Sequence, residues 1–342
     1  MKVVVSGANG FLGSHIVRLL RKDGFEVVAL VREGSSSKFI DRSGADICFV
    51  DYNNKLDLQK CFSGADFFVH SAALAKDWGE WSEFKRVNIE LTGMLINMAL
   101  EAGIKDVIHI SSNAVIGEED NINRKNEEHD YLPRINYFLE RWFPSGMNHY
   151  KCSKRDAEER AIFLAELNKL NLTVLRPVWI FGPREFNSGP YEYCKTITSK
   201  IPVMPGTNSN KFHTVYVEDV AKSVLCAIQK RLSGVNIFNI GPKRVMFMQE
   251  FYGKFCKELG LKRPKNLPMA LLFFPVLILE LVYLFLKIKT PPLLTRARLY
   301  MLYANNIYDV GKAEREIGFV ADSDIDYAVR KTVKWWKVNG YL

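Results

Sequence analysis

Two side chains stand at a spacing that suits proton transfer. Tyr150 and Lys154 lie four residues apart in "NHYKCSKRDAEERAIFLAEL", which we expect to be helical, so both would share one helix face. A tyrosine, with an ordinary pKa of about 10, is a poor base at neutral pH. An ammonium group one turn away stabilises the phenolate and lowers that pKa, so that Tyr150 can exchange a proton with an alcohol or carbonyl oxygen. Ser112, in "HISSNAVIG" at the end of an expected strand, could hold the same oxygen with its hydroxyl group.

A glycine-rich turn precedes these residues in the chain. "KVVVSGANGFLGSHIVRLLRKDGFEVVALVR" reads as strand, turn, amphipathic helix and second strand. A pyrophosphate binds well at a helix N-terminus, where backbone N–H groups and the helix dipole favour negative charge. In such a site Gly7 permits the turn, Gly10 lets the backbone approach the phosphate, and Gly13 lets helix and strand pack closely. We therefore predict a dinucleotide site that includes Gly7, Asn9, Gly10, Phe11, Leu12 and Gly13.

A dinucleotide gives the Tyr150–Lys154 pair its chemistry. Tyr-x-x-x-Lys alone is common on helix surfaces, and its meaning here comes from the glycine turn and the serine that precede it. A cationic nicotinamide ring would add to the effect of Lys154 on the tyrosine pKa, and Lys154 would also reach the ribose hydroxyl groups. We predict that Ser112, Tyr150 and Lys154 form the catalytic set, with Tyr150 and Lys154 also contacting the cofactor. No metal site is predicted.

The end of the second strand bears on the choice between NAD and NADP(H). NAD sites usually place an acidic residue there for the ribose hydroxyls, but this chain reads "LVREGSSSK", with Arg32 at that place. A guanidinium followed by serine hydroxyls and Lys38 suits a 2′-phosphate. We favour NADP(H). The alternative is that Arg32 stacks on adenine or lies in solvent, which leaves NAD acceptable.

The strand–helix pattern then repeats. Residues 45–52 and 65–73 read as strands, 87–104 as a helix, and 105–117 as the next strand. Alternation of this kind predicts an α/β fold with a doubly wound parallel sheet and a site at the carboxyl ends of its strands. Asp51 and Tyr52 would meet the adenine, and the small Ala72 and Ala73 would leave room for the cofactor.

The segments "GANGFLG", "HSAA", "VNIELTG", "SSNAVIG", "YKCSK" and "LRPVWIFGP" together resemble the extended branch of the short-chain dehydrogenase/reductase superfamily. The resemblance implies that Ser112 is the catalytic serine, Tyr150 the acid/base and Lys154 its partner. It also implies that Asn88 is a structural asparagine and that Pro177 and Val178 lie against the nicotinamide. We expect a Rossmann dinucleotide-binding and catalytic domain over residues 1–180. A smaller, mostly helical substrate-binding part would occupy 181–342, with some segments returning to the sheet.

The C-terminal third resembles the 3β-hydroxysteroid dehydrogenase and sterol dehydrogenase family. A hydrophobic segment there precedes "PPLLT", "DVGKA" and a Trp-rich terminal helix. The resemblance implies hydride transfer at a secondary alcohol or ketone on a bulky hydrophobic molecule, such as a steroid, a terpenoid or a long-chain keto acid. One alternative is a nucleotide-sugar epimerase or reductase, in which Arg184, Lys211 and Arg244 would clamp a diphosphate. A second is a non-catalytic NADP-binding regulatory protein.

Composition bounds the partners and the compartment. The 342 residues are 48% hydrophobic and 25% charged with a net charge of +9, a globular composition. The charge suits an anionic cofactor or membrane face, and no nucleic-acid-binding motif is present. Six scattered cysteines, together with an N-terminus that enters a strand directly, predict a cytoplasmic protein with reduced thiols. By analogy with extended reductases, a homodimer is expected.

Two segments remain outside these motifs. Residues 268–289, "PMALLFFPVLILELVYLFLKIK", fall short of the roughly 20 apolar residues of a spanning helix. We expect two short helices broken near Pro275, which line the substrate pocket and contact one leaflet of a membrane; a buried helix pair is the alternative. The charged and aromatic insert between Gly117 and Tyr150 would be either a wall of the pocket or a solvated loop.

Overall fold

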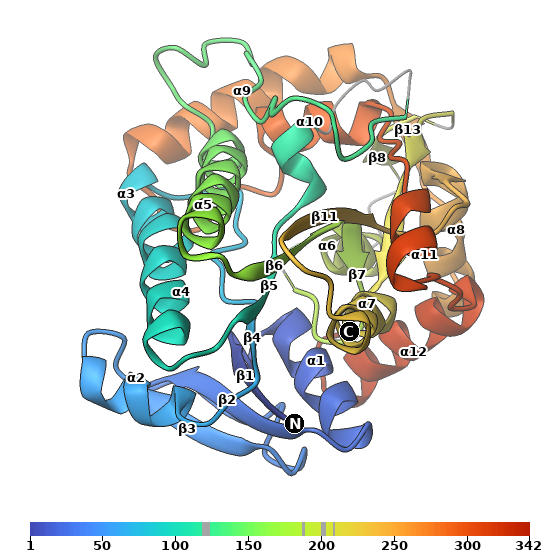
Figure 1. The fold of residues 1–342 in the computed structure, drawn as a ribbon. Coiled ribbons are helices and arrows are strands. Elements are labelled where there is room, and N and C mark those ends of the chain that lie inside the picture. Colours follow the sequence, from blue (N-terminus) through green and yellow to red (C-terminus); the bar gives the residue numbers. More distant parts are fainter. Residues whose placement is uncertain (118–123, 187–188, 200–202, 208) are drawn as a thin grey trace.

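The molecule is built on a parallel seven-stranded sheet (Figure 1). The computed structural model describes residues 1–117, 124–186, 189–199, 203–207 and 209–342. The strand order is β11-β6-β5-β4-β1-β2-β3, and each neighbouring pair is parallel. The strands are β1 (Lys2–Ser6), β2 (Glu26–Arg32), β3 (Asp46–Val50), β4 (Phe67–His70), β5 (Asp106–Ile110), β6 (Asn171–Pro177) and β11 (Val235–Ile240). The order reverses direction between β1 and β4, which confirms the predicted doubly wound sheet and places a crevice at that point.

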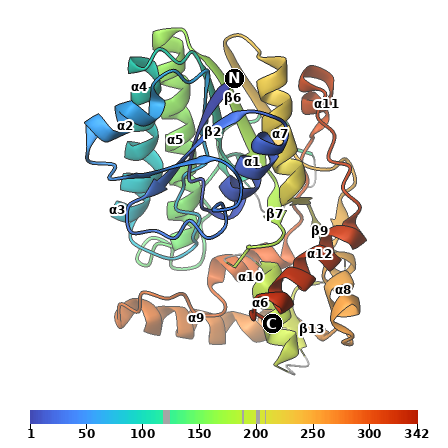
Figure 2. The same cartoon turned by 90° about the horizontal axis from the view of Figure 1, so that it is seen from below.

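Helices cover both faces of the sheet (Figure 2). One face carries α1 (Phe11–Lys22) and α7 (Val217–Lys230), and the other carries α2 (Lys55–Phe62), α4 (Leu91–Glu101) and α5 (Gly146–Asn168). Side chains of β1 alternate between these layers, since Val3 and Val5 join the core beneath α1 while Val4 joins the core beneath α4. Burial on both faces explains why the strand is apolar without interruption.

The remaining elements form a mostly helical part beside the carboxyl ends of the strands (Figure 2). Its helices are α6 (Gly189–Thr198), α8 (Met248–Leu259), α9 (Met269–Phe285), α10 (Arg296–Tyr303) and α12 (Ile325–Val338), while α11 (Gly311–Ile317) packs against β11 and α7. Its short strands pair as β7 (Trp179–Phe181) with β10 (Thr214–Tyr216), β9 (Lys211–Phe212) with β12 (Met246–Phe247), and β8 (Val203–Pro205) with β13 (Lys265–Leu267). Between β10 and β12 the chain returns to the sheet to supply α7 and β11.

Two expected elements have other bounds than predicted. The helix expected over 87–104 starts earlier, as α3 (Trp81–Phe84) followed by a π-helical segment (Lys85–Glu90), and it ends with α4 at Glu101. The strand expected over 105–117 ends at Ile110 and is followed by a 3₁₀ helix (Asn113–Ile116). That helix begins where the Ser112 hydroxyl accepts a hydrogen bond from Ala114 N, so the serine ends the extended backbone.

The apolar segment forms one helix, and the predicted break at Pro275 is wrong. α9 runs unbroken from Met269 to Phe285, with Pro275 on its exposed side. A proline there removes one intrahelical hydrogen bond, and the outward position leaves the rest of the helix free to continue. No helix among the described residues is long and apolar enough to cross a membrane. The insert is described from residue 124 onward, and residues 118–123 lie outside the described ranges.

Candidate active site

The glycine turn between β1 and α1 has the shape of a phosphate-binding site. Gly7 has a φ of +64°, and a Cβ added there would lie 2.7 Å from the backbone N of Ala72. A Cβ at Gly13 would clash with the carbonyl oxygen of Gly7, so the turn and the helix are packed without side-chain room. α1 has no acidic residue in its first turn and no side-chain cap at Gly10. Its first amides therefore remain available for an anion, and these residues fit a dinucleotide pyrophosphate.

The adenosine end of the predicted site lies at the carboxyl ends of β2 and β3. Arg32 closes β2 and pairs with Val50, so Asp51 and Tyr52 follow directly beside it. Burial raises the pKa of Tyr52 to about 12, against the opposing effect of the nearby Arg32 cation. The Asn9 side chain donates to Ser36 O at 2.9 Å and ties the glycine turn to the loop after β2. The predicted adenosine contacts thus gather at one edge of the sheet.

Helix α5 carries Tyr150 and Lys154 to the crevice from the opposite side. Lys154 is almost fully buried, and its Nζ donates to Ile110 O at 2.7 Å at the end of β5. Burial lowers the pKa of Lys154 to about 8, although Glu158 one turn further opposes the shift. Tyr150 and Ser112 line one cavity, and Pro177 and Val178 form another part of its wall. The structure therefore brings Ser112 and Tyr150 to one cavity, and Lys154, which does not line it, lies one turn from Tyr150 on α5.

Asn88 connects two segments next to this site, the loop after β4 and helix α5. It lies in the π-helical segment and is buried. Its side chain accepts from Leu74 N at 2.7 Å and donates to Ser153 Oγ at 2.8 Å, so it links the loop after β4 to α5 beside Tyr150. The same loop contains Ala72, whose backbone packs closely against Gly7, and Ala73, which follows it.

A buried ion pair near the predicted catalytic set was not predicted from the sequence. Arg176 Nε donates to Glu158 Oε1 at 3.0 Å, and the two side chains are 2% and 0% exposed. Glu158 also accepts from the hydroxyls of Ser111 and Tyr131, the latter at 2.8 Å. One sequence signal was available, because Glu158 follows Lys154 by one turn and Arg176 interrupts the apolar strand before Pro177.

The cavity leads from the catalytic residues into the helical part. Its volume is about 560 Å³, in the size range of small-molecule sites. Beyond Ser112 and Tyr150 its lining is chiefly apolar and includes Met147, Trp179, Ile180, Phe186, Tyr193, Tyr252, Leu267, Leu272, Leu293, Leu294, Met301 and Leu302. At its rim, Arg298 Nη2 donates to Asp77 Oδ1 at 2.8 Å, so this cation is already paired. The cavity suits a large hydrophobic molecule.

The basic clamp considered for a sugar diphosphate is not assembled here. Arg184 lines the cavity, but Lys211 and Arg244 are not among its lining residues. Arg244 is exposed and pairs with Glu250 at 2.7 Å. The three cations therefore do not converge on one ligand position in this conformation.

The fold and this site define a dinucleotide-binding α/β protein, and comparison with known proteins narrows the class. The model of the NAD dependent epimerase/dehydratase family matches residues 3–241. The chain belongs to this family, which confirms the resemblance seen in the glycine turn and the Tyr-x-x-x-Lys segment.

Curated relatives match nearly the whole chain. A 3beta-hydroxysteroid-dehydrogenase/decarboxylase isoform 1 from Arabidopsis thaliana is 25% identical and covers 96% of this chain and 78% of its own length. A sterol-4-alpha-carboxylate 3-dehydrogenase, decarboxylating, from Mus musculus is 26% identical, with 97% of this chain and 90% of its own covered. These names agree with the predicted likeness to sterol dehydrogenases.

Solved structures share the fold. The protein gox2253 aligns with a TM-score of 0.79 at 23% identity, covering 99% of both chains. A UDP-glucose 4-epimerase from Thermotoga maritima, in complex with UDP-glucose, aligns with a TM-score of 0.76 at 21% identity, also covering 99% of both chains. At these identities the likeness establishes the α/β architecture of this chain.

Proposed function

We propose that the protein is an oxidoreductase that interconverts a secondary alcohol and a ketone on a bulky hydrophobic substrate. The observation that carries the proposal is the single cavity that joins Ser112 and Tyr150 to an apolar lining from α9 and α10. Steroids, terpenoids and long-chain keto acids have the size and polarity that this lining fits. The sterol dehydrogenases among the relatives support the first of these classes.

The roles of the side chains follow from their positions. The bound nicotinamide cofactor would supply or accept the hydride. Ser112 binds the substrate oxygen, and Tyr150 gives it a proton or takes one from it. Lys154 stabilises the tyrosinate, and its hydrogen bond to Ile110 O fixes the ammonium one turn from Tyr150. We assign these three roles as part of the proposal.

The test uses the purified protein with a panel of hydrophobic ketones and reduced cofactor, followed by cofactor absorbance. We expect turnover of at least one steroid or terpenoid ketone and none of UDP-glucose. Turnover of the nucleotide sugar would favour the epimerase alternative, which the aligned epimerase supports at the level of fold. Binding of cofactor without turnover of any substrate class would favour the regulatory alternative.

We further propose that NADP(H) is preferred over NAD. Arg32 is exposed at the end of β2, and the loop behind it presents Ser35, Ser36, Ser37 and Lys38. A 2′-phosphate placed there would meet a guanidinium that is free of a preceding carboxylate. The ratio of kcat/KM for NADPH to that for NADH measures the preference, and a ratio below one contradicts it.

We propose that the outward face of α9 contacts a membrane surface, so that the protein is peripheral on the cytoplasmic face. The apolar residues of this face are between 41% and 71% exposed: Leu271, Phe274, Ile278, Leu279, Val282, Phe285 and Leu286. Phe138 and Trp142 of the insert are also exposed, at 52% and 67%, and Phe138 contacts Phe273 of α9 edge to face. An apolar surface of this extent is unusual on a soluble monomer. α9 projects from the body of the molecule in Figure 2.

Charge indicates which membrane this surface would meet. Lys287 and Lys289 follow α9, Arg141 precedes Trp142, and all three are exposed. Basic residues beside an apolar surface favour a leaflet rich in anionic lipid. Leu272 of the same helix lines the cavity, so a lipophilic substrate would pass from the leaflet to the site over a short path.

Vesicle sedimentation tests this contact. We expect the protein to pellet with vesicles of phosphatidylcholine and phosphatidylglycerol. A variant with Leu271→Gln, Phe274→Gln, Ile278→Gln and Phe285→Gln should stay in the supernatant. A control with Phe49→Gln and Leu56→Gln, which are exposed elsewhere at 53% and 69%, should pellet like the parent protein. Equal pelleting of all three proteins would exclude α9 as the contact.

A homodimer remains a proposal for the oligomeric state. Phe163 and Leu167 lie one turn apart on α5 and are 56% and 65% exposed, which gives a second protomer an apolar helix face. Sedimentation velocity of the parent and of a Phe163→Glu, Leu167→Glu variant distinguishes a dimer through α5 from a monomer.

A further inference from the structure

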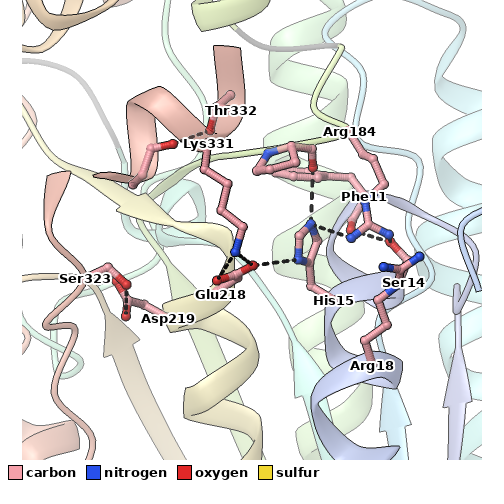
Figure 3. Close-up of polar contacts among 12 residues, drawn as sticks. Phe11, Ser14, His15, Arg18, Arg184, Glu218, Asp219, Ser323, Lys331 and Thr332 are labelled. Carbon is pink, nitrogen blue, oxygen red and sulfur yellow. Dashed lines mark hydrogen bonds and ion pairs between the residues drawn. The ribbon is translucent and has the colours of Figure 1, made fainter. Parts of the chain in front are cut away.

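A second cavity adjoins α1 and shares Arg184 with the active-site cavity. Its volume is about 590 Å³, and it lies between α1, α7, α12 and the loop that follows β7. Figure 3 shows its polar centre, where Arg184 and His15 meet on one side and Glu218 and Lys331 on the other. We refer to this cavity as the basic cleft.

The lining of the basic cleft has a large excess of positive charge. It contains five cations, Arg18, Lys22, Arg184, Lys331 and Lys334, against one carboxylate, Glu218. That carboxylate is already paired, because Lys331 Nζ donates to both of its oxygens at 2.8 and 3.1 Å. Within a concave site, such an excess attracts a multivalent anion.

Arg184 is the most deeply buried of these cations, and its burial is therefore unfavourable for stability. Its side chain is 7% exposed, and its guanidinium donates only to neutral groups: Ser14 Oγ at 2.7 Å, His15 Nε2 at 2.9 Å, and Phe39 O at 3.5 Å. No ion pair with Arg184 is recorded among the described residues. Burial, followed by the nearby Arg18, lowers the pKa of Arg184 to about 10. Glu218 opposes this shift, but it is already paired with Lys331, so an anion from outside the chain would further stabilise the buried cation.

His15 does not relieve this excess. Nε2 of His15 lies 2.9 Å from Arg184 Nη2 and 3.2 Å from Pro183 O, while Nδ1 faces Glu218 Oε1 at 3.9 Å. Burial, and then the Arg184 charge, lowers the pKa of His15 to about 3, so the ring is neutral at neutral pH. Its role is to orient Arg184 toward the cleft.

The rest of the lining indicates what the anion carries. Phe39 and Trp335 face the cleft, and their rings meet edge to face at 5.9 Å. Aromatic rings beside guanidinium and ammonium groups bind a flat apolar body that bears a phosphate. We propose that the basic cleft binds a small organic phosphate, a monoester with a planar ring, separately from the dinucleotide.

One other source of phosphate is the dinucleotide itself. Arg184 also lines the active-site cavity, and Ser14 lies one turn beyond the start of α1. The pyrophosphate at that helix end and a ligand in the cleft would therefore both stabilise this guanidinium. The test must be made with the cofactor site already filled.

Calorimetric titration of phenyl phosphate into the protein saturated with cofactor is that test. We expect one binding event, and weaker binding of inorganic phosphate, which lacks the ring. A Lys22→Glu, Lys334→Glu variant should bind phenyl phosphate about tenfold more weakly or worse, because two cations of the cleft become anions. Both side chains are exposed, so the fold should be retained, as circular dichroism and cofactor binding would verify.

The matched control is a Lys195→Glu, Lys337→Glu variant, which has the same net charge. Both lysines are exposed and neither lines the cleft, so affinity should stay within about twofold of the parent value. Three results would overturn the proposal: no heat in the cofactor-saturated protein, displacement of the cofactor by phenyl phosphate, or equal loss in both variants. None depends on turnover, so a failure of the proposed enzyme activity is recognised separately.

Discussion

Each half of the molecule contains a buried glutamate–arginine pair, and the two pairs have different neighbours. Glu158 and Arg176 lie within the sheet half, where Glu158 also accepts hydrogen bonds from Ser111 and Tyr131, near the residues proposed to be catalytic. Glu280 and Arg296 lie in the helical half and are 1% and 0% exposed. There Arg296 Nη2 also donates to Phe143 O at 2.7 Å, and Arg296 Nη1 donates to Phe138 O. The pair therefore joins α9 to the insert. The first pair lies next to the proposed catalytic set, and the second holds α9, which contributes Leu272 to the cavity wall.

The difference suggests how the two halves divide their work. In the sheet half, polar groups are placed by backbone hydrogen bonds at strand ends, as Lys154 is by Ile110 O. In the helical half, the cavity lining is chiefly apolar, and Arg298, one of its cations, is paired with Asp77 from the loop after β4. Chemistry should therefore respond to changes in the first half, and substrate and membrane binding to changes in the second.

The largest effect is expected for Tyr150→Phe in the sheet half. Loss of the hydroxyl removes the proton exchange, so kcat should fall by about a thousandfold, while cofactor affinity stays close to that of the parent. Steady-state kinetics and a cofactor titration measure the two quantities. Turnover near the parent rate would show that another group moves the proton.

Removal of the glutamate from either buried pair should lower stability by a similar amount, but the two changes should affect activity differently. Glu158→Ala and Glu280→Ala each leave an arginine buried without its anion, and each should lower the free energy of unfolding by about 3–5 kcal/mol. Urea unfolding measures this loss. Among molecules that remain folded, Glu158→Ala should lower kcat for any ketone, whereas Glu280→Ala should mainly raise KM for large ones.

A control for these two variants removes both partners together. Glu280→Leu combined with Arg296→Met leaves no unpaired charge and should recover most of the stability lost in Glu280→Ala. If the double variant is as unstable as the single one, the packing of α9 rather than the uncompensated charge of Arg296 explains the loss.

The pH dependence of stability tests the burial of Lys154. Its pKa is lowered from 10.5 to about 8 in the folded protein, so the unfolded chain binds more protons between these values. The contribution of Lys154 to the free energy of unfolding should therefore rise with pH across that window, by about 3 kcal/mol in total. Urea unfolding of the parent protein and of Lys154→Met, each at about pH 8 and at about pH 10.5, measures this contribution. An identical pH profile in the variant would contradict the buried, shifted lysine.

The smallest effect is expected at the cofactor's adenosine end. Arg32→Ala should lower kcat/KM for NADPH by about tenfold and leave that for NADH nearly unchanged, because one charge-assisted contact to the 2′-phosphate is lost. Arg42→Ala, an exposed arginine in the same region, serves as control. Equal losses with both cofactors would show that Arg32 contacts the adenosine without reading the phosphate.

Much of the sheet half could be predicted because its signals are local. Gly7, Gly10 and Gly13 lie within seven residues, and Tyr150 and Lys154 within five, so one turn and one helix face decide their geometry. The Glu158–Arg176 pair could not be read in this way, because it depends on how α5 lies over β6. The basic cleft likewise takes its cationic residues from α1, the loop after β7 and α12, which are distant in the chain.

The helical half was harder to predict because its strongest signal is ambiguous. Proline usually interrupts a helix, and a break at Pro275 was the local expectation, but tertiary contacts of α9 with α10 and the insert maintain one helix through it. The sequence showed that residues 268–289 were apolar, and only the folded chain showed how many of them are exposed.

The single carboxylate of α9 also sets the rotation of that helix about its own axis. Apolar side chains surround α9 on every side, so hydrophobicity by itself would allow it to roll without a preferred orientation. Glu280 accepts hydrogen bonds from both the backbone N and the guanidinium of Arg296. Rotation of α9 about its axis would break these bonds and leave the Arg296 cation buried without its anion. The position of this one acidic residue thus determines which apolar side chains of α9 are exposed on the protein surface.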